Sequence, residues 1–291
     1  MQLVRFSVGS KPTVIGIIRN GHVHALADLV SDLPQDVRDL IADWDRVKAV
    51  IAGIDRFPVG LPLGEVTLRA PIARPGKILA LGLNYADHIE EAKAAGATIP
   101  TEQVWFCKQP TSINDPNGDV ELPKVSDQLD YEVELVAVIG KKGRHISREN
   151  APAHVFGYAV GNDVTVRDWQ WKTPQWMLGK SFDTHCPFGP AIVTSDEVGD
   201  PHSLGVRCFV NRERRQNSNT RHFVFNLWDQ IAELSQAMTL EPGDLIFTGT
   251  PGGVGFGTKP PRPLVVGDVV RCEIDRIGMI ENRIVAEQSG S

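Results

Sequence analysis

The chain has 291 residues, of which 42% are hydrophobic and 23% are charged, a composition typical of a folded globular protein and not of a disordered one. Its 30 basic and 36 acidic residues give a net charge of -6, and no Lys/Arg-rich run is present, so we expect no nucleic-acid partner. The longest apolar runs are far shorter than the roughly 18 residues of a membrane span, so we expect no membrane association.

The four cysteines lie far apart in the sequence and form no C-x-x-C pair. They are Cys107, Cys186, Cys208 and Cys272. This spacing argues against a disulfide framework or a zinc knuckle. The N-terminal stretch also lacks the apolar segment of a signal peptide. Together these features predict a protein of the reducing cytoplasm.

The first 70 residues have the pattern of a small α+β unit. Two short strands are expected over 3–8 and 13–26, with turn residues between them. Apolar residues at steps of three and four predict a helix over 33–51, with Gly53 as its stop. A Pro- and Gly-rich stretch follows over 56–77. We therefore predict a small N-terminal domain over 1–70 and a main domain over 71–291.

The main domain is predicted to be mostly β. Strands are expected at 77–85, 119–123, 130–140, 155–166, 189–194, 206–211, 244–250 and 269–285. Two helices interrupt them, one over 85–95 and one that begins after Asn226, a favourable N-cap residue. Many strands with few helices predict an α+β protein built on an antiparallel roll or barrel, and not a βαβ sheet.

The stretch over 129–139 contains two carboxylates in an otherwise apolar strand. Glu132 and Glu134 are two residues apart, so on a strand they point to the same face. The remaining residues of both faces are apolar, which predicts that the strand is buried. Like charges about 4 Å apart repel by roughly 4 kcal/mol at an effective dielectric of 20. Because a divalent cation removes this repulsion, metal binding is favoured over a structural ion pair.

A hard-cation site needs a third acid, and Asp163 and Asp168 follow the next apolar strand. Asp163 comes directly after that strand and is the better candidate. Carboxylate ligands without His or Cys favour Mg²⁺, Mn²⁺ or Ca²⁺ over zinc. Arg167 and Lys180 are candidates to offset the excess negative charge and to hold an anionic substrate. The alternative is that both are ordinary surface charges.

Two further motifs carry candidate functional groups. His88 and Glu91 share a face of the expected helix, so the carboxylate can orient the imidazole to take a proton from water. The same spacing is also common on exposed helix faces. The glycine-rich stretch 249–257 lacks the Walker spacing and a following helix. It predicts a tight loop that brings the backbone and the Thr250 hydroxyl close to a ligand.

Six motifs occur in one order along the chain. They are LNYADHIEEA, WFCKQPTSI, LDYEVELVAVIGKK, GNDVTVRDWQ, LGKSFDTHCPFGP and GDLIFTGTPGGVGFG. Over roughly residues 70–285 they resemble the fumarylacetoacetate hydrolase superfamily. The resemblance is to the branch of FAH-domain-containing proteins, acylpyruvases and dioxo-sugar-acid hydrolases. It implies a mixed β-roll catalytic domain preceded by a small α+β domain, and usually a homodimer.

The resemblance also implies roles for individual residues. It implies a Mg²⁺ or Mn²⁺ site formed by Glu132, Glu134 and Asp163, and catalytic roles for His88, Glu91 and Lys180. It implies substrate contacts from Arg167, Gln170, Lys108 and Thr250. The founding fumarylacetoacetases take the glutamate of the His-Glu pair from elsewhere in the chain, so this sequence departs from them.

These features predict a metal-dependent hydrolase that cleaves the C–C bond of a small 2,4-dioxo acid of the acylpyruvate type. His88 is expected to activate water, while the metal and Lys180 stabilise the enolate that leaves. One alternative is an oxaloacetate-type decarboxylase or a 2-oxo-heptenedioate isomerase, which needs the same enolate stabilisation without attack by water. The other is a metal-stabilised binding protein without turnover.

Overall fold

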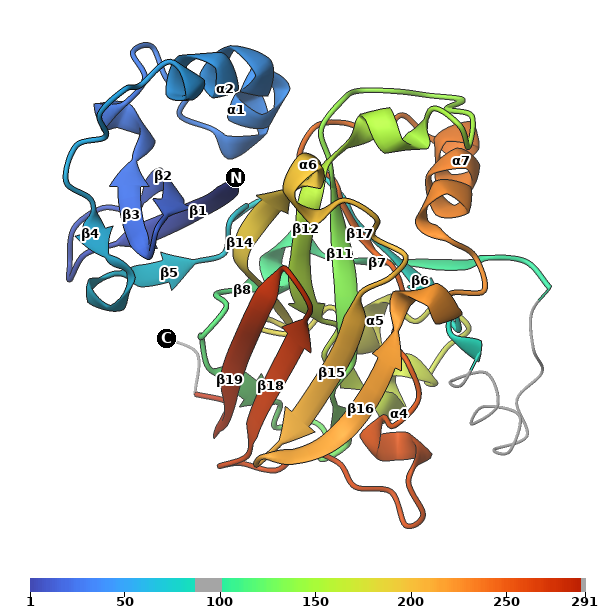
Figure 1. The fold of residues 1–291 in the computed structure, drawn as a ribbon. Coiled ribbons are helices and arrows are strands. Elements are labelled where there is room, and N and C mark those ends of the chain that lie inside the picture. The colour runs from blue at the N-terminus through green and yellow to red at the C-terminus, as the bar shows by residue number, and fades with distance from the viewer. Residues whose placement is uncertain (87–100, 289–291) are drawn as a thin grey trace.

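The computed structural model describes residues 1–86 and 101–288. Most strands belong to one large sheet in the order β4-β3-β2-β1-β14-β12-β11-β17-β6-β7, with β5 paired to β1 and β8 paired to β14. A five-stranded sheet in the order β16-β15-β18-β19-β9 lies beside it (Figure 1). The expected helix over 85–95 lies outside the described residues from position 87 onward.

The N-terminal part contributes five strands to the large sheet. They are β1 (Gln2–Ser7), β2 (Val14–Arg19), β3 (His22–Ala25), β4 (Leu61–Pro62) and β5 (Thr67–Arg69). Strand β1 also pairs with β14 of the main part through Gln2↔Val193 and Leu3↔Ile192. The division at residues 70/71 stays a prediction, although a strand pairing crosses it.

The single helix expected over 33–51 is two helices, α1 (Val37–Ala42) and α2 (Trp44–Ala52), which lie over one end of the N-terminal strands in Figure 1. The first begins only at Val37 because the carboxylate of Asp36 accepts the N–H of Arg38 as an N-cap. Asp43 separates the two helices with a backbone conformation outside the helical range. The apolar spacing was correctly detected, but the cap and the break were not.

The strands at the centre of the large sheet hold the buried carboxylates described below. These strands are β14 (Cys186–Thr194), β12 (Val155–Asn162), β11 (Val133–Ile139), β17 (Leu245–Phe247), β6 (Ile78–Gly82), β7 (Val104–Lys108) and the short β8 (Ile113–Asn114). Every residue of β11 is buried, as expected from its two apolar faces. This strand lies between β12 and β17, so it is the middle of the core.

The second sheet consists of β9 (Val120–Leu122), β15 (Gly205–Val210), β16 (Glu213–Asn219), β18 (Val269–Ile274) and β19 (Gly278–Ala286). Its inner face and one face of β11 share a hydrophobic core that includes Leu135, Val206 and Ile280. The α+β class with a mixed roll is confirmed. Most neighbouring strands of the described residues pair antiparallel, and the parallel pairs β17–β6, β14–β8 and β19–β9 make the roll a mixed one.

The remaining elements are short, apart from helix α7 (Leu227–Ala237). Its predicted cap is confirmed, since the side chain of Asn226 accepts the N–H groups of Trp228 and Asp229. The others are β10 (Leu129–Asp130), β13 (Thr165–Val166), α4 (Arg167–Gln170), α5 (Met177–Lys180), α6 (Ser195–Val198), and the 3₁₀ turns η1 (Leu26–Asp28), η2 (Leu63–Glu65), η3 (Pro110–Ser112), η4 (Ala151–His154), η5 (Thr220–His222) and η6 (Gly255–Gly257). In the described part of the chain, no helix is long and apolar enough to cross a membrane.

Candidate active site

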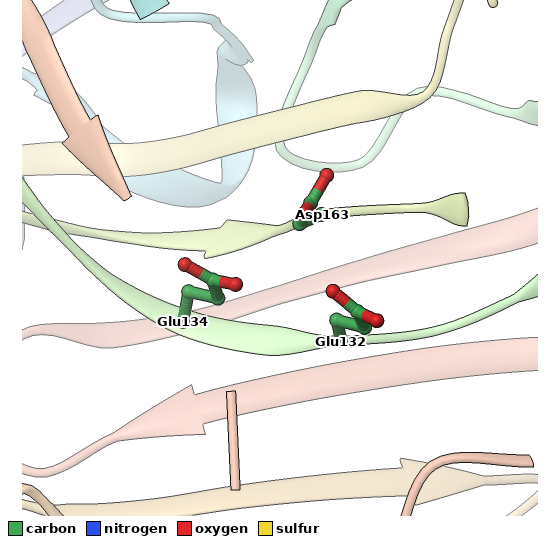
Figure 2. A group of neighbouring side chains, drawn as sticks. All are labelled: Glu132, Glu134 and Asp163. Carbon is green, nitrogen blue, oxygen red and sulfur yellow. The ribbon is translucent and has the colours of Figure 1, made fainter. Parts of the chain in front are cut away.

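Three buried carboxylates meet at the end of β11. Glu132 precedes the strand and Glu134 lies within it, and both side chains point to the same face (Figure 2). Asp163 follows the neighbouring strand β12, and its N–H donates to the carbonyl of Glu132. One oxygen from each of the three carboxylates lies within 4.8 Å of the other two. The predicted juxtaposition of these acids is therefore present.

Three buried cations surround the carboxylates. The Nζ of Lys180 lies 2.7 Å from Oε2 of Glu132 and 2.6 Å from Oδ2 of Asp163. The Nζ of Lys108 lies 2.6 Å from Oδ1 of Asp163. The Nη1 of Arg167 lies 2.6 Å from Oε1 of Glu132. Because Lys180 and Arg167 are only 2% and 5% exposed, they are not ordinary surface charges.

Two one-turn helices place Arg167 and Lys180, while Lys108 ends strand β7. Arg167 and Gln170 lie on α4, and Lys180 ends α5. The two turns pack closely at Gly179, where a Cβ atom would lie 2.3 Å from the backbone nitrogen of Gln170. Only glycine fits this contact, because real Cβ atoms do not approach other atoms so closely. Gly179 therefore lets α5 present the next residue, Lys180, to the carboxylates.

The buried charges do not balance. Asp130 is a fourth buried carboxylate in this region, so four carboxylates face the three cations Lys108, Arg167 and Lys180. Glu134 is the unmatched one. Its Oε2 accepts the N–H of Gly249 at 2.8 Å, and no cation of the described residues forms an ion pair with it.

This imbalance is the test of whether a metal fits. Burial raises the pKa of Glu134 well above its usual value, and the charges of Asp163 and Glu132 add to the effect. A buried carboxylate without a cation is costly, and a divalent ion held by the three acids removes that cost. The donor set consists of oxygens only, which suits Mg²⁺ or Mn²⁺. The residues present therefore fit a divalent metal.

The lysine and the arginine remain cationic despite their burial. Burial alone lowers the pKa of Lys180, but the negative charges of Asp163 and Glu132 outweigh it, so the pKa is raised. The pKa of Arg167 is raised in the same way, against the effect of burial, by Asp130 and Glu132. With a divalent ion held by the three acids, the fixed positive charges of Lys180 and Arg167 suit an anionic ligand.

The side chains of the four residues expected to bind substrate form contacts with other protein groups of the site. These residues are Arg167, Gln170, Lys108 and Thr250. The Oε1 of Gln170 accepts a hydrogen bond from Nη1 of Arg167 at 3.0 Å. The hydroxyl of Thr250 donates to the carbonyl of Val133 at 3.0 Å. The side chain of Lys108 has no exposed surface. Their substrate-binding roles stay predictions, and His88 and Glu91 lie outside the described residues.

Two residues that the sequence argument did not assign contribute to the site. The amide of Gln216 accepts the N–H of Val133 at 3.1 Å and donates to the Thr250 hydroxyl at 2.8 Å. It comes from β16, a strand too polar to be detected by its hydrophobic pattern. Asp130 lies two residues before Glu132, so its position in the acidic stretch was a usable signal.

The glycine-rich loop joins the site at both of its ends. At its start the N–H of Gly249 binds Glu134, and near its end the N–H groups of Gly255 and Phe256 donate to Asp130. A cavity of about 270 Å³ borders this loop. It is lined by Gln128, Leu129, Asp130, Arg167, Phe256, Pro261 and Pro263. The loop backbone therefore contacts two buried carboxylates, and its expected approach to a ligand stays a prediction.

Comparison with known proteins decides the family. The model of the family described as "Fumarylacetoacetate (FAA) hydrolase C-terminal" matches residues 77–285. The chain belongs to the fumarylacetoacetate hydrolase family. The range matched contains all four carboxylates and all three cations of the site. The resemblance inferred from the motifs is thereby confirmed, and the chain is an enzyme of this superfamily.

Relatives within the family differ in the reaction that their names give. The chain is 42% identical over 291 residues to the "Oxaloacetate tautomerase fahd2, mitochondrial" of Xenopus laevis, covering 98% of this chain and 90% of the relative. Among solved structures it is similar to a putative HpcE protein from Mycobacterium smegmatis (TM-score 0.90, 35% identity, 99% and 100% covered). It is also similar to maleylpyruvate hydrolase from Sphingobium sp. SYK-6 in complex with manganese (II) ion and pyruvate (TM-score 0.80, 33% identity, 99% and 100% covered).

Two expectations change with these comparisons. The cytoplasmic location is wrong, because the Xenopus relative is named as mitochondrial. The cysteine argument separates reducing from oxidising compartments, and it does not distinguish one reducing compartment from another. The names also support the oxaloacetate-type alternative better than the C–C bond hydrolase. Both reactions pass through an enolate. The charged site suits either of them, so the site alone does not distinguish the two reactions.

Proposed function

We propose that this enzyme interconverts the keto and enol forms of oxaloacetate with the help of a bound Mg²⁺ or Mn²⁺ ion. The observation that carries the proposal is the buried cluster of Glu132, Glu134 and Asp163 with the cations Lys180 and Arg167 at its edge. Such a cluster is suited to a dianionic 2-oxo acid. The high identity to the Xenopus oxaloacetate tautomerase over almost the whole chain supports this choice of substrate.

The reaction moves one proton and leaves the carbon skeleton unchanged. The C–H bond next to the keto group breaks, its electron pair forms the C=C bond, and the keto oxygen takes up a proton. Negative charge develops on that oxygen. Glu132, Glu134 and Asp163 would hold the metal ion, which supplies Lewis-acid polarisation of the 2-oxo group when it is bound.

The protein's own groups bind and orient the substrate. Lys180 is held by two carboxylates, so its ammonium is fixed in place and is able to donate a hydrogen bond to the developing oxyanion. Arg167, whose guanidinium lies between Asp130 and Glu132, contributes a fixed positive charge that favours a carboxylate of the substrate. His88, with Glu91 to orient its imidazole, is proposed as the group that takes and returns the carbon-bound proton.

Hydrolysis of a 2,4-dioxo acid is the second candidate. The observation that favours it is the structural similarity to maleylpyruvate hydrolase, whose structure holds manganese and pyruvate. It requires the same enolate stabilisation and, in addition, attack by water on the distal carbonyl. The two candidates therefore differ in whether a water molecule is consumed.

One set of assays separates the candidates. The purified protein, treated with chelator and then given MnCl₂, is mixed with enol-oxaloacetate and, separately, with acetylpyruvate. We expect metal-dependent loss of the ultraviolet absorbance of the enol, with little pyruvate released from acetylpyruvate. Lys180→Met, which removes the charge at similar length, should abolish the reaction. Pyruvate release as the only activity would move the assignment to the hydrolase, and full activity in excess chelator would overturn the metal site.

The assembly and domain organisation are part of the proposal. We propose a homodimer, as the family resemblance implies, and a functional division into residues 1–70 and 71–291. Light scattering coupled to gel filtration tests the dimer, since the mass of one chain is 31.9 kDa. An eluted mass of a single chain at micromolar concentration would contradict it.

A further inference from the structure

Asp130 binds more groups than any role in the proposed reaction requires. Its Oδ1 accepts the N–H groups of Tyr131 at 2.9 Å and of Gly255 at 2.7 Å. Its Oδ2 accepts the N–H of Phe256 at 2.9 Å and the Nε of Arg167 at 2.9 Å. The side chain is 1% exposed. Both oxygens are therefore occupied by protein donors, so Asp130 is itself poorly placed to serve as a metal ligand.

These contacts fix the direction of one guanidinium group. Nε and Nη2 of Arg167 face Asp130, with Nη2 at 2.8 Å from Oδ2. Nη1 then points the other way, to Oε1 of Glu132 at 2.6 Å. Arg167 thus bridges Asp130 and the metal-binding carboxylate of Glu132. A guanidinium is planar and rigid, so holding one edge determines where the other edge lies.

The same carboxylate also fixes the glycine-rich loop. At Gly255 a Cβ atom would lie 2.7 Å from Oδ1 of Asp130 and 2.4 Å from the carbonyl of Arg262. The loop therefore approaches Asp130 at a distance that only glycine allows. The start of this loop binds Glu134 through the N–H of Gly249. Asp130 consequently contacts two structures, Arg167 and the loop, that each touch a different metal-binding acid.

We propose that Asp130 is a positioning residue that sets the metal affinity of the site by holding Arg167 against Glu132 and the glycine-rich loop beside Glu134. It deepens the proposed function and rests on its metal site, not on the identity of the substrate. Groups that orient metal ligands typically change metal affinity or activity by about 10–100-fold when they are altered. Asp130 acts mainly through Arg167, because that contact is the charged one.

A double-mutant cycle on Mn²⁺ binding tests this role without any substrate. The dissociation constant of Mn²⁺ is measured by calorimetry for the unsubstituted protein, Asp130→Asn, Arg167→Gln and the double variant. We expect Asp130→Asn to weaken Mn²⁺ binding by about tenfold in the unsubstituted background. In the Arg167→Gln background the same change should have an effect below about threefold, because the coupled group is gone.

Asp244→Asn is the matched control. Asp244 is also 1% exposed and binds a lysine and a backbone N–H, Lys77 at 2.7 Å and Glu241 at 2.8 Å, but it precedes β17 at the end away from the site. It should lower the melting temperature and leave the Mn²⁺ dissociation constant unchanged. If Asp130→Asn does not fold, Asp130→Glu replaces it, since an added methylene shifts Arg167 while the charge is kept.

The possible outcomes are distinct. Equal weakening of Mn²⁺ binding in both backgrounds would show that Asp130 acts through the fold alone and would overturn the proposal. Unchanged Mn²⁺ binding in Asp130→Asn would overturn it as well. Absence of oxaloacetate tautomerisation in the unsubstituted protein would reject the proposed function, while the Mn²⁺ cycle would still decide the role of Asp130.

Discussion

The ammonium of Lys108 lies 2.6 Å from Oδ1 of Asp163, and neither side chain exposes any surface to solvent. Asp163 gives its other oxygen, Oδ2, to Lys180 at 2.6 Å. The carboxylate is thus held between two lysines from opposite sides. One lysine ends β7 and the other ends α5, so segments distant in the sequence together fix the orientation of one acid.

Replacing Lys108 by methionine should destabilise the metal-free protein strongly. Methionine fills a similar volume, but it leaves Asp163 with one buried cation instead of two, and breaking a buried pair costs on the order of 3–5 kcal/mol. Added Mn²⁺ should raise the free energy of unfolding of the variant by more than it raises that of the unsubstituted protein. Urea unfolding with and without MnCl₂ measures both effects.

Lys77→Met provides the control for this prediction. Lys77 pairs with Asp244 at 2.7 Å and is 27% exposed. Its loss should lower stability by a smaller amount that does not depend on Mn²⁺. A Lys108→Met protein whose loss is equally independent of Mn²⁺ would contradict the link between Lys108 and the metal site.

Replacing Glu134 by glutamine should have opposite effects on stability and on metal binding. Glu134 forms no ion pair with a cation of residues 1–86 and 101–288, and burial together with Asp163 and Glu132 raises its pKa. The neutral amide removes this unfavourable charge, so the metal-free variant should melt at a higher temperature. Mn²⁺ binding should weaken by at least about tenfold, because one charged ligand is lost. A lower melting temperature in chelator would argue against charge repulsion at this position.

The alternation of side chains along a strand correctly predicted that the carboxylates of Glu132, Glu134 and Asp163 lie together. Glu132 and Glu134 share a face because side chains alternate along a strand, and that rule needs only local sequence. Asp163 was placed correctly because it follows an apolar strand. The N-cap at Asn226 was predictable for the same reason, since capping depends on residues one turn away. Local sequence rules were sufficient to predict contacts between residues close in the sequence and the face of a strand on which a side chain lies.

The sequence offered Arg167 and Lys180 as candidates to offset the negative charge, but the burial of the cations and the pairing of each with its carboxylate were not predictable. Lys108 is 55 residues from Asp163 and Lys180 is 48 residues from Glu132, so their burial depends on how distant segments pack. The short helices that carry Arg167 and Lys180 have four residues each, too few for a helical period. Strand β16, which supplies Gln216, is mostly polar and gave no alternating pattern.

The buried His185 should make stability depend on pH. Burial lowers its pKa from 6.5 to about 3, although its hydrogen bond to the carbonyl of Glu121 acts in the opposite direction. Below pH 6.5 the unfolded chain therefore binds a proton that the folded chain does not. Stability present above pH 6.5 should fall as the pH drops toward 3, by up to about 1.4 kcal/mol per pH unit from this residue.

His185→Gln tests this effect, because the amide keeps an N–H donor for the Glu121 carbonyl but does not titrate. The free energy of unfolding of the variant should fall less steeply between pH 6.5 and pH 5. His222→Gln, at an exposed histidine, is the control and should keep the slope of the unsubstituted protein. Identical slopes for His185→Gln and the unsubstituted protein would exclude the effect.

Replacing Asn226 by alanine should destabilise helix α7 by about 1 kcal/mol. The side chain of Asn226 accepts the N–H groups of Trp228 and Asp229, which lose their partner in the variant. Asn226→Asp keeps an acceptor at the same position and should restore the stability. Thermal unfolding of the three proteins measures the difference, and equal melting temperatures would show that the cap contributes little.

The pairing of β1 with β14 has a consequence for the solubility of the enzyme. Strand β14 is bordered on one side by β12, and on the other side β1 covers part of its edge. An uncovered strand edge presents free N–H and C=O groups that recruit strands from other molecules. The N-terminal strands therefore protect this edge of the sheet from pairing with strands of other molecules. A protein shortened to residues 71–291 should retain its charged cluster and nevertheless aggregate.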